Sequence, residues 1–364
     1  MPVIRRRIVA LAVAALVTTA GAACSAPRSA AGANRPSTSP RASAEPAPTA
    51  RSAPPPGQFT VAFAGDVHFA GRTRQLLNDP STAIGPTSKV FAAADLAMVN
   101  LETAITEGGV PEPKQFHFRA PATTFAALKA GGIDVTTLAN NHALDYGQSG
   151  LRDTLTAIDS THYPTVGIGR NADAAYAAWI TQVRGTRIAF IGLSQIHERA
   201  PQWTATATRP GIASALDIPR SVAAVKAARA NADVMIVYLH WGQEGNHCPT
   251  AAMSQLAAAL TAAGADAIVS THAHLLLGDG YLGRTFVAYG LGNFVWWLDN
   301  AYSNDTGVLT LTFDGRQVTR SAFTPAQIGS TGQPVPATGA TASRVSAKYA
   351  GLRSCTGLAA APTG

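Results

Sequence analysis

Short apolar runs alternate with alanine-rich segments from Phe59 onward. Nearly every position in the runs is apolar, a pattern typical of strands buried on both faces of a sheet. The predicted strands are "FTVAFAG", "DLAMVN", "IDVTTLAN", "RIAFIGL", "ADVMIVYLHWG", "ADAIVSTHAH" and "TFVAYGLGNF". Segments with helical spacing that end near Gly or Asn predict helices; they are "PATTFAALKAGG", "GQSGLRDTLTAIDS", "PRSVAAVKAARANA" and "TAAMSQLAAALTAAGA". This alternation predicts an α/β fold.

Two glycine-containing turns lie between strand-like segments, in "VRGTRI" and "FDGRQV". Such turns predict antiparallel hairpins at sheet edges. We therefore expect mixed sheets rather than purely parallel ones.

The first 23 residues differ in pattern from the rest. Three arginines at positions 5 to 7 precede an apolar stretch of about 15 residues, whereas a membrane-spanning helix needs about 20. This order predicts a signal peptide over residues 1–23. Cys24 ends "TAGAAC", which is similar to a bacterial lipobox, so we expect lipidation of Cys24 and anchoring on the outer face of the cell membrane. A plain secreted protein is the alternative.

Residues 24–57 contain mainly Ala, Pro, Ser, Thr and Arg, and they offer almost nothing to bury. We expect a disordered tether here. Seven of the 28 basic residues and one of the 21 acidic residues precede residue 58, which leaves 21 basic against 20 acidic residues. The folded part therefore has a net charge of about +1, which argues against a nucleic-acid partner.

Polar side chains follow five of the predicted strands directly. They are Asp66, His68, Asn100, Glu102, Asn140, Asn141, His142, His240, Glu244, His272 and His274. Because loops at the carboxyl ends of parallel strands meet at one crevice, we expect these side chains to lie close together.

Each motif alone has an ordinary explanation: Asp66-x-His68 can close a turn, "NNH" can cap a helix, and His240 can pack in a core. Their joint occurrence after successive strands favours a metal site. Imidazole nitrogens with carboxylate and amide oxygens suit divalent first-row ions, and a bridging carboxylate allows a pair of ions. We expect two divalent ions, with manganese, iron or zinc as candidates. No cysteine lies among the candidate ligands, which argues against a closed structural zinc site.

Cys248 and Cys355 are the two cysteines that remain after Cys24. In an exported protein such cysteines more often pair than stay reduced. We therefore expect a Cys248–Cys355 disulfide.

The motifs "GDVHF", "NLET", "LANNHALDYG", "HWGQE", "DAIVSTHAH" and "YGLGNF" occur in this order. In this order they resemble the bacterial capsule synthesis protein CapA family, which is similar in fold to calcineurin-like metallophosphoesterases. The resemblance spans Phe59 to Phe313. It implies a metallophosphatase-like four-layer α/β/β/α sandwich, with mixed sheets and the helices outside. We expect this domain to occupy residues 58–325 and a C-terminal extension, residues 326–364, to pack on it.

The resemblance also implies roles for individual residues. Three match the ligands of a first metal ion: Asp66, His68 and His274. Three match the ligands of a second: Asn141, His240 and His272. Where the superfamily has Gly-Asp-x-x-Asp this chain has "VNLET", so Glu102 is assigned to the bridging position, with Asn100 as the alternative. His142 matches the histidine that contacts the phosphoryl group or protonates the leaving oxygen in those enzymes. Four residues are expected to support the ligands or contact substrate: Asn100, Asn140, Glu244 and Asn293.

Two functions are compatible with this resemblance. One is a surface-anchored, metal-dependent phosphoesterase-like hydrolase. The other is a metal-binding accessory protein, without turnover, in the assembly or export of an anionic polymer such as poly-γ-glutamate. An exported nucleotidase is a weaker third candidate. The expected partners are the polymer or a phosphoester substrate, the membrane through the lipid anchor, and a polymer synthase or export complex.

Overall fold

The computed structural model describes residues 57–363. The predicted signal peptide, the lipidation site Cys24 and the tether up to residue 56 lie outside the described residues. The described part begins at strand β1 (Gln58–Val67), where the predicted domain begins. None of its helices has the length and apolar character needed to cross a bilayer.

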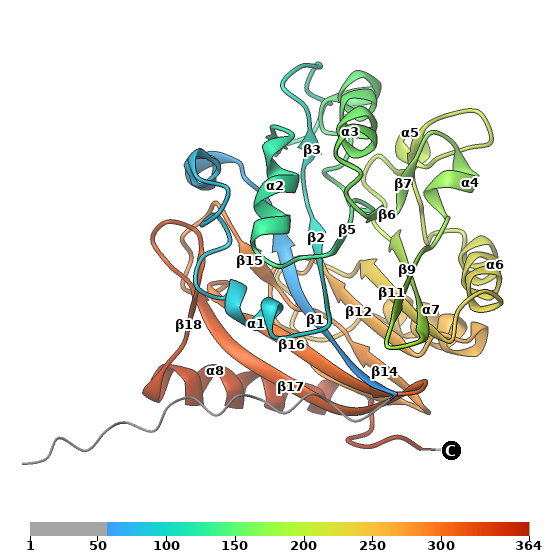
Figure 1. Ribbon diagram of the computed structural model, residues 1–364, viewed down its shortest axis with the longest axis vertical. Helices are drawn as coiled ribbons and strands as arrows, with labels where there is room; N and C mark the ends of the chain where they lie inside the picture. Colours follow the sequence, from blue (N-terminus) through green and yellow to red (C-terminus); the bar gives the residue numbers. More distant parts are fainter. Residues whose placement is uncertain (1–56, 364) are drawn as a thin grey trace, which may run out of the picture. The chain divides into compact units, whose positions relative to one another are not determined.

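The first large sheet has the strand order β18-β17-β16-β1-β2-β5-β6, and β15 also pairs with β1 (Figure 1). The neighbours from β1 to β6 run parallel, as does β15, whereas β16, β17 and β18 pair antiparallel. Besides β1, its strands are β2 (Leu96–Leu101), β5 (Val135–Thr137), β6 (Thr165–Val166), β15 (Asn293–Val295), β16 (Asp305–Asp314), β17 (Gln317–Ile328) and β18 (Pro334–Pro336).

The second large sheet has the order β13-β14-β12-β11-β9-β8. Its four middle strands are parallel, and an antiparallel strand lies at each edge. The strands are β8 (Trp179–Val183), β9 (Thr186–Ser194), β11 (Val234–His240), β12 (Ala267–Thr271), β13 (Asp279–Leu282) and β14 (Thr285–Ala288). The predicted hairpins β8–β9 and β16–β17 are both confirmed.

The central core lies between the two sheets. Phe59 and Phe63 of β1 pack there with Tyr238 of β11. Ala62 and Ala64 of β1 belong instead to the core under the helices, because successive residues of a strand face opposite sides. Burial on both faces explains why the predicted strands are apolar at almost every position.

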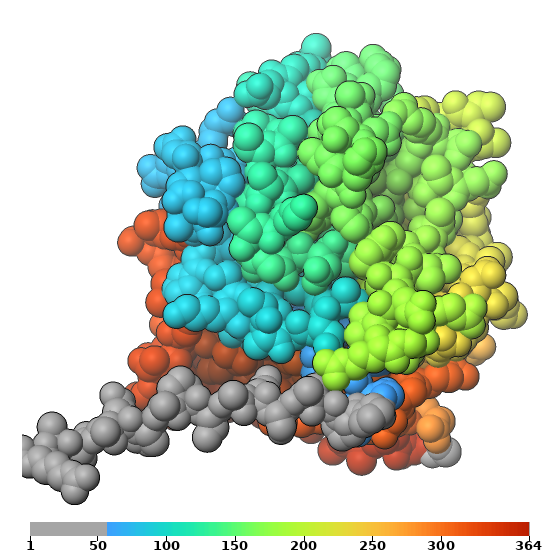
Figure 2. Space-filling model, viewed as in Figure 1, coloured from blue at the N-terminus to red at the C-terminus, as the bar shows by residue number. Residues whose placement is uncertain are grey.

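Helices cover the outer face of each sheet. The helices α1 (Ser88–Ala92), α2 (Thr123–Ala130) and α3 (Gly147–Thr161) contribute apolar side chains to the core outside the first sheet. Their cyan-to-green segments form much of the surface in Figure 2. The helices α6 (Ile218–Arg229) and α7 (Ala251–Ala263) do the same for the second sheet. The four-layer α/β/β/α sandwich is therefore confirmed.

Short elements connect these layers. They are the 3₁₀ helix η1 (Gly71–Asn78), helices α4 (Ala172–Ala175) and α5 (Ala200–Trp203), the strand pair β3 (Ala104–Ile105) and β4 (Arg119–Ala120), and the pair β7 (Ile168–Gly169) and β10 (Gly211–Ile212).

The C-terminal segment, residues 326–363, contributes to the first sheet and to the central core of the domain. The expected boundary at residue 325 falls inside β17, and β18 continues the same sheet. Helix α8 (Gly339–Gly351) buries Val345 and Tyr349 in the central core, and η2 (Leu352–Cys355) follows it. The sequence did not predict the full length of β17 because most of its residues are polar or only half-buried.

Candidate metal centre

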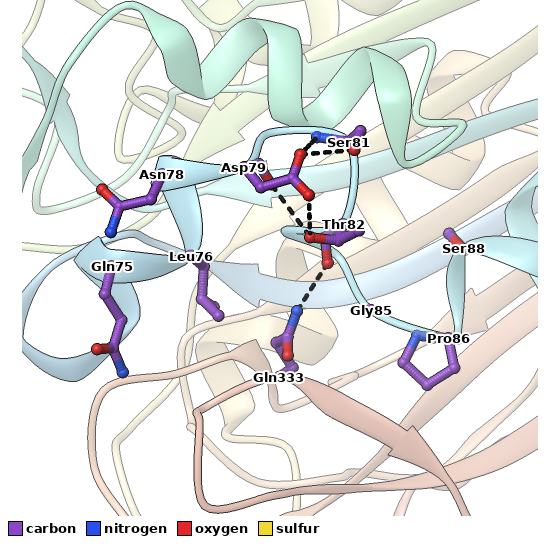
Figure 3. Close-up of a pocket in the computed structure, with 10 residues that line it drawn as sticks. All are labelled: Gln75, Leu76, Asn78, Asp79, Ser81, Thr82, Gly85, Pro86, Ser88 and Gln333. Carbon is purple, nitrogen blue, oxygen red and sulfur yellow. Dashed lines mark hydrogen bonds between the residues drawn. The ribbon is translucent and has the colours of Figure 1, made fainter. Parts of the chain in front are cut away.

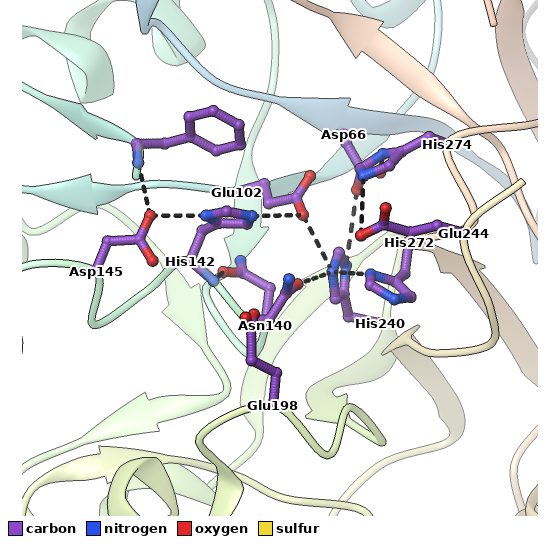
Figure 4. Close-up of polar contacts among 12 residues, drawn as sticks. Asp66, Glu102, Asn140, His142, Asp145, Glu198, His240, Glu244, His272 and His274 are labelled. Atoms are coloured by element: carbon purple, nitrogen blue, oxygen red, sulfur yellow. Dashed lines mark hydrogen bonds and ion pairs between the residues drawn. The ribbon is translucent and has the colours of Figure 1, made fainter. Parts of the chain in front are cut away.

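Most of the polar residues predicted at strand ends lie close together, as Figure 4 shows for Asp66, Glu102, His142, His240, His272 and His274. Asp66 and His240 lie at the ends of β1 and β11. Glu102, Asn141 and His272 lie one to four residues beyond β2, β5 and β12. Since β11 and β12 belong to the second sheet, the site is formed by both sheets rather than by one.

The first donor group surrounds the Nε2 atom of His240. Asn141 Oδ1 lies 2.7 Å from it, His272 Nδ1 3.0 Å and Glu102 Oε1 3.2 Å. All four side chains are buried. Bonds of about 2.0–2.2 Å from a metal ion to such atoms would leave neighbouring ligand atoms about 3 Å apart. These residues therefore have the spacing and chemistry to hold a divalent ion.

The second donor group consists of Asp66, Glu102 and His274. Nδ1 of His274 lies 3.4 Å from Asp66 Oδ2 and 2.9 Å from Asn293 Oδ1. Asp66 Oδ2 has no hydrogen-bond partner in the described part of the chain. This group also fits a divalent ion, and Asn293 offers a further oxygen donor.

Glu102 is the residue that both donor groups share. It is fully buried, and within residues 57–363 neither of its carboxylate oxygens has a hydrogen-bond partner. In contrast, Asn100 Nδ2 donates to Asp66 Oδ1 at 2.7 Å, and Asn100 Oδ1 accepts from Asn140 Nδ2 at 3.0 Å. The geometry thus favours Glu102 over Asn100 as the bridging residue, and it gives both asparagines a supporting position.

Burial raises the pKa of Glu102 well above its usual value, and the neighbouring Asp66 carboxylate raises it further. For Asp66, burial acts in the same direction, but His274, with its Nδ1 3.4 Å from Asp66 Oδ2, and the imidazole of His240 lower the pKa of Asp66 overall. Burial lowers the pKa of His240 to about 4. Burial opposes protonation of His274 as well, yet Asp66 and Glu102 raise its pKa to about 9. The buried carboxylates of Asp66 and Glu102 therefore stabilise a positive charge beside them, and a metal ion would supply such a charge.

His68 lies beside the two donor groups but belongs to neither. Its Nδ1 accepts a hydrogen bond from the Ala70 N–H at 3.1 Å, and its ring is stacked on Phe118 with 4.2 Å between ring centroids. Its Nε2 is buried and lacks a hydrogen-bond partner among the residues described. His68 thus stays a candidate ligand whose ring is held by aromatic packing.

His142 faces the donor groups from the loop after β5. Its Nδ1 lies 2.7 Å from Asp145 Oδ2, and its Nε2 lies 3.9 Å from Glu102 Oε1. Lys114, whose side chain is only 3% exposed, lies 2.9 Å from Asp145 Oδ1. Burial and the Lys114 ammonium hold the pKa of His142 well below its usual value. The arrangement fixes the imidazole by its Nδ1 atom and leaves its Nε2 edge facing Glu102.

A family model described as "Bacterial capsule synthesis protein PGA_cap" matches residues 60–296. The chain belongs to this family. Both donor groups, His68 and His142 lie inside the matched segment.

Curated relatives of this PGA_cap chain include two Bacillus proteins. "PGA biosynthesis protein CapA" of Bacillus subtilis (strain 168) is 30% identical over 243 residues, which are 65% of this chain and 63% of that protein. "Capsule biosynthesis protein CapA" of Bacillus anthracis is 29% identical over 247 residues, with 65% and 60% covered. A Mycobacterium tuberculosis (strain H37Rv) protein named "Probable polyglutamine synthesis accessory protein" is 32% identical over 214 residues, 56% of each chain. The matches thus span less than two thirds of each relative's length.

Solved structures give weaker matches to the PGA_cap chain. A phosphatase from Mycoplasma pneumoniae has a TM-score of 0.45 at 13% identity, with 74% of this chain and 93% of that chain covered. The NAD nucleotidase of Haemophilus influenzae has a TM-score of 0.43 at 16% identity, with 83% and 64% covered.

Two of the PGA_cap chain's candidate ligands have a strained backbone. His272 and His274 have φ angles of 101° and 57°, in the region that favours glycine. Such strain is found chiefly where the surrounding structure fixes a functional geometry.

Only glycine fits at position 65, because a Cβ there would lie 1.8 Å from the carbonyl oxygen of Gly292. This close approach of β1 and the segment before β15 sets the position of Asp66.

Two further sequence predictions concern the loop after β11. Glu244 is 61% exposed in its side chain and lies 4.0 Å from His274 Nε2, so it stands at the rim of the centre. Cys248 and Cys355 form a disulfide that joins this loop to η2. The disulfide fixes the base of the loop that carries Glu244.

Neither Asp145 nor Lys114 was among the residues that the sequence pattern predicts for the site. Asp145 had a signal, since it follows His142 by three residues in "NNHALD". Lys114 lies on a loop 28 residues before His142, and no sequence pattern connects the two.

A pocket of about 530 Å³ lies along η1 and the turn after it (Figure 3). None of its lining residues is a predicted site residue. Its one acidic side chain, Asp79, already accepts hydrogen bonds from Ser81 and Thr82. Among residues 57–363, the groups that could hold a metal ion therefore lie at the candidate metal centre and not in this pocket.

Proposed function

We propose that this protein is a metal-dependent, phosphoesterase-type hydrolase that serves the synthesis or export of an anionic capsule polymer such as poly-γ-glutamate. One observation carries the proposal: two donor groups share the buried carboxylate of Glu102, which accepts no hydrogen bond within residues 57–363, and His142 faces that carboxylate. Membership of the capsule synthesis family supports the polymer context.

Two divalent ions are proposed for this centre. Glu102, Asn141, His240 and His272 would hold one of them. Asp66, Glu102, His274 and Asn293 would hold the other, with His68 as a further ligand. Nitrogen and oxygen donors without a thiolate suit manganese, iron or zinc. When bound, such ions act as Lewis acids on phosphoryl oxygens and orient the substrate.

His142 is the proposed general acid. Because burial and Lys114 hold the pKa of His142 low, the imidazole would take up its proton only when an anionic phosphoryl group lies beside Nε2. Asp145 accepts the hydrogen bond of Nδ1–H and balances the charge of that imidazolium. Proton transfer from Nε2 to the leaving oxygen then leaves a neutral imidazole that is still held by Asp145. Phe118 stacks on the imidazole at 4.2 Å between ring centroids and shields that face from water.

The principal alternative is a metal-binding accessory protein without turnover. It is supported by the name of the Mycobacterium tuberculosis relative, which describes an accessory protein of polymer synthesis. The Asp145–His142 pair favours the hydrolase, because an ion-binding scaffold has no need of an oriented imidazole outside its ligand set. An exported nucleotidase is a weaker candidate.

We further propose that residues 1–23 direct export and that lipid on Cys24 holds the protein on the outer face of the membrane. Secretion without an anchor is the alternative. The proposed partners are the anionic polymer or a phosphoester substrate and a polymer synthase or export complex.

Hydrolysis of bis(4-nitrophenyl) phosphate by the manganese-loaded chain tests the proposal. We expect turnover that chelation abolishes and that His142→Asn reduces by about a hundredfold. His162→Asn, a histidine at the end of α3, is the matched control and should leave the rate unchanged. A chain that binds metal and hydrolyses neither this diester nor 4-nitrophenyl phosphate would favour the accessory role.

A further inference from the structure

Exposed apolar side chains are concentrated next to the metal centre. Across residues 57–363, six large hydrophobic side chains are exposed, and four of them lie on two loops, residues 106–118 and 296–304. These four are Val110 (77% exposed), Phe116 (45%), Leu298 (43%) and Tyr302 (53%). Single exposed hydrophobic residues are ordinary, whereas such a concentration marks a binding surface.

Both loops contact the metal centre directly. Phe118, at the end of the first loop, stacks on His142. Trp296, at the start of the second, packs on His274 with 4.5 Å between ring centroids. Buried aromatic rings therefore lie against the candidate ligands, and exposed side chains of the same two loops lie farther out.

Trp297 connects the two loops. Its ring centroid lies 6.1 Å from that of Phe116 and 5.9 Å from that of Phe118. Tyr302 extends the surface toward the loop after β11, where its hydroxyl donates to the Gly245 carbonyl at 3.2 Å. We call Phe116, Trp297, Leu298 and Tyr302 the apolar rim. Val110 is not part of it, because its backbone lies beside Gly147 at the start of α3.

The cations on or beside these two loops are already paired with acidic groups. Lys114 contacts Asp145 at 2.9 Å and Glu198 at 3.2 Å. Two arginines are paired in the same way: Arg199 with Glu112 at 2.5 Å and Arg72 with Asp299 at 3.5 Å. Arg72 also donates to the carbonyl of Leu298 at 2.7 Å and so holds the second loop in place.

The carboxylates around the centre are more accessible than these cations. The side chain of Glu244 is 61% exposed, that of Glu198 is 43% exposed and that of Asp299 is 62% exposed. Glu198 and Asp299 are the partners of Lys114 and Arg72, whereas Glu244 has no arginine or lysine partner in the described part of the chain. A chain of free carboxylates such as poly-γ-glutamate would meet the like charge of Glu244, which disfavours its binding. A flat, uncharged ring would instead bury apolar area against Phe116 and Trp297.

We propose that the apolar rim binds the organic group of the substrate and selects a ring-bearing phosphoester whose ring carries no free carboxylate, rather than the polyglutamate chain itself. The proposal rests on the proposed phosphoesterase function for the position of the phosphoryl group at the metal centre. It adds the class of group that lies beside that centre.

Binding of two phosphonates to the manganese-loaded full chain tests this proposal. Phenylphosphonate and methylphosphonate share the charged head and differ in the ring. By calorimetry we expect phenylphosphonate to bind at least about tenfold more tightly, because the ring buries apolar area. Phe116→Ala should remove most of that difference. The control Ile180→Ala changes a similarly exposed apolar residue on the edge strand β8 and should not. Equal affinities for the two phosphonates, or no binding of either, would overturn the proposal.

A third probe, 4-carboxyphenylphosphonate, tests the charge argument. We expect it to bind about tenfold more weakly than phenylphosphonate and Glu244→Gln to reduce that penalty. Binding as tight as that of phenylphosphonate would contradict the exclusion of carboxylates. Phosphonates are not hydrolysed, so these results do not depend on turnover. A chain that discriminates among the phosphonates but hydrolyses no ester would contradict the proposed function and leave the apolar rim standing.

Discussion

Replacing Glu102 with glutamine should stabilise the protein without metal and destabilise it with metal. Glu102 is fully buried, its two carboxylate oxygens have no hydrogen-bond partner in the described part, and the Asp66 carboxylate lies in the same donor group. Glu102→Gln keeps the size and removes the charge. The new amide can also donate to Asp66 Oδ2, which lies 3.4 Å from His274 Nδ1 and accepts no hydrogen bond among residues 57–363.

The magnitude follows from these contacts. A buried polar atom without a partner costs about 1–3 kcal/mol, so the substitution should stabilise the metal-free protein by about 2 kcal/mol. For a domain of this size, that corresponds to a rise in Tm of about 4 °C. Glu102→Gln should also stabilise the protein if the folded Glu102 carboxyl takes up a proton. Protonating that carboxyl at pH 7 costs free energy relative to the ionised unfolded chain, and glutamine avoids this cost.

With metal bound, the wild type should be more stable than Glu102→Gln. At a free metal concentration of 100 times Kd, each site adds about 2.7 kcal/mol to the stability of the wild type, and two sites add about twice that. Because Glu102 belongs to both donor groups, Glu102→Gln should lose most of this gain.

Thermal unfolding in EDTA and in manganese measures both effects. The matched control is Glu244→Gln, which makes the same chemical change at an exposed position near His274 and should shift stability by less than about 0.5 kcal/mol in EDTA. A lower Tm of Glu102→Gln in EDTA, or an unchanged gain with manganese, would refute the reasoning.

Three further predictions use separate measurements. Elemental analysis should find full metal content in His142→Ala and a loss in His274→Ala, while turnover of His142→Ala falls by about a hundredfold; equal metal loss would mean that ligand and acid are exchanged. Asp305 accepts two hydrogen bonds from Arg344 at 2.7 Å, and these hold its pKa below the usual range. In urea unfolding, Asp305→Asn should therefore cost about 2 kcal/mol at pH 7, and the cost should shrink as the pH falls below about 4; a pH-independent cost would contradict the ion pair. Cys24→Ser should release the protein from membranes in a high-salt wash, and retention would indicate that residues 8–23 form an uncleaved anchor.

The metal centre was predictable to the extent that its residues follow apolar strands immediately. Asp66, Glu102 and His240 stand at such positions, so the strand pattern alone brings them to one edge. The pattern does not say that two sheets share the site. That depends on the packing of Phe63 against Tyr238, which no local periodicity encodes.

Other features depend on contacts between distant segments. Lys114 reaches Asp145 from a loop that has no regular structure, so its role has no periodic signal. His68 matched a ligand motif, but its ring is packed between Phe118 and Trp296 and lies in neither donor group. A motif identifies residue types, whereas the neighbouring side chains decide which atoms meet.

Metal content per chain shows whether Glu102 joins two divalent ions. The full chain, loaded with manganese and passed through gel filtration, should retain about two ions per molecule, because sites with this many protein ligands bind tightly. Glu102→Gln treated in the same way should retain about half an ion or less. A wild-type chain with less than about 0.2 ion after loading with manganese, iron or zinc would contradict the account.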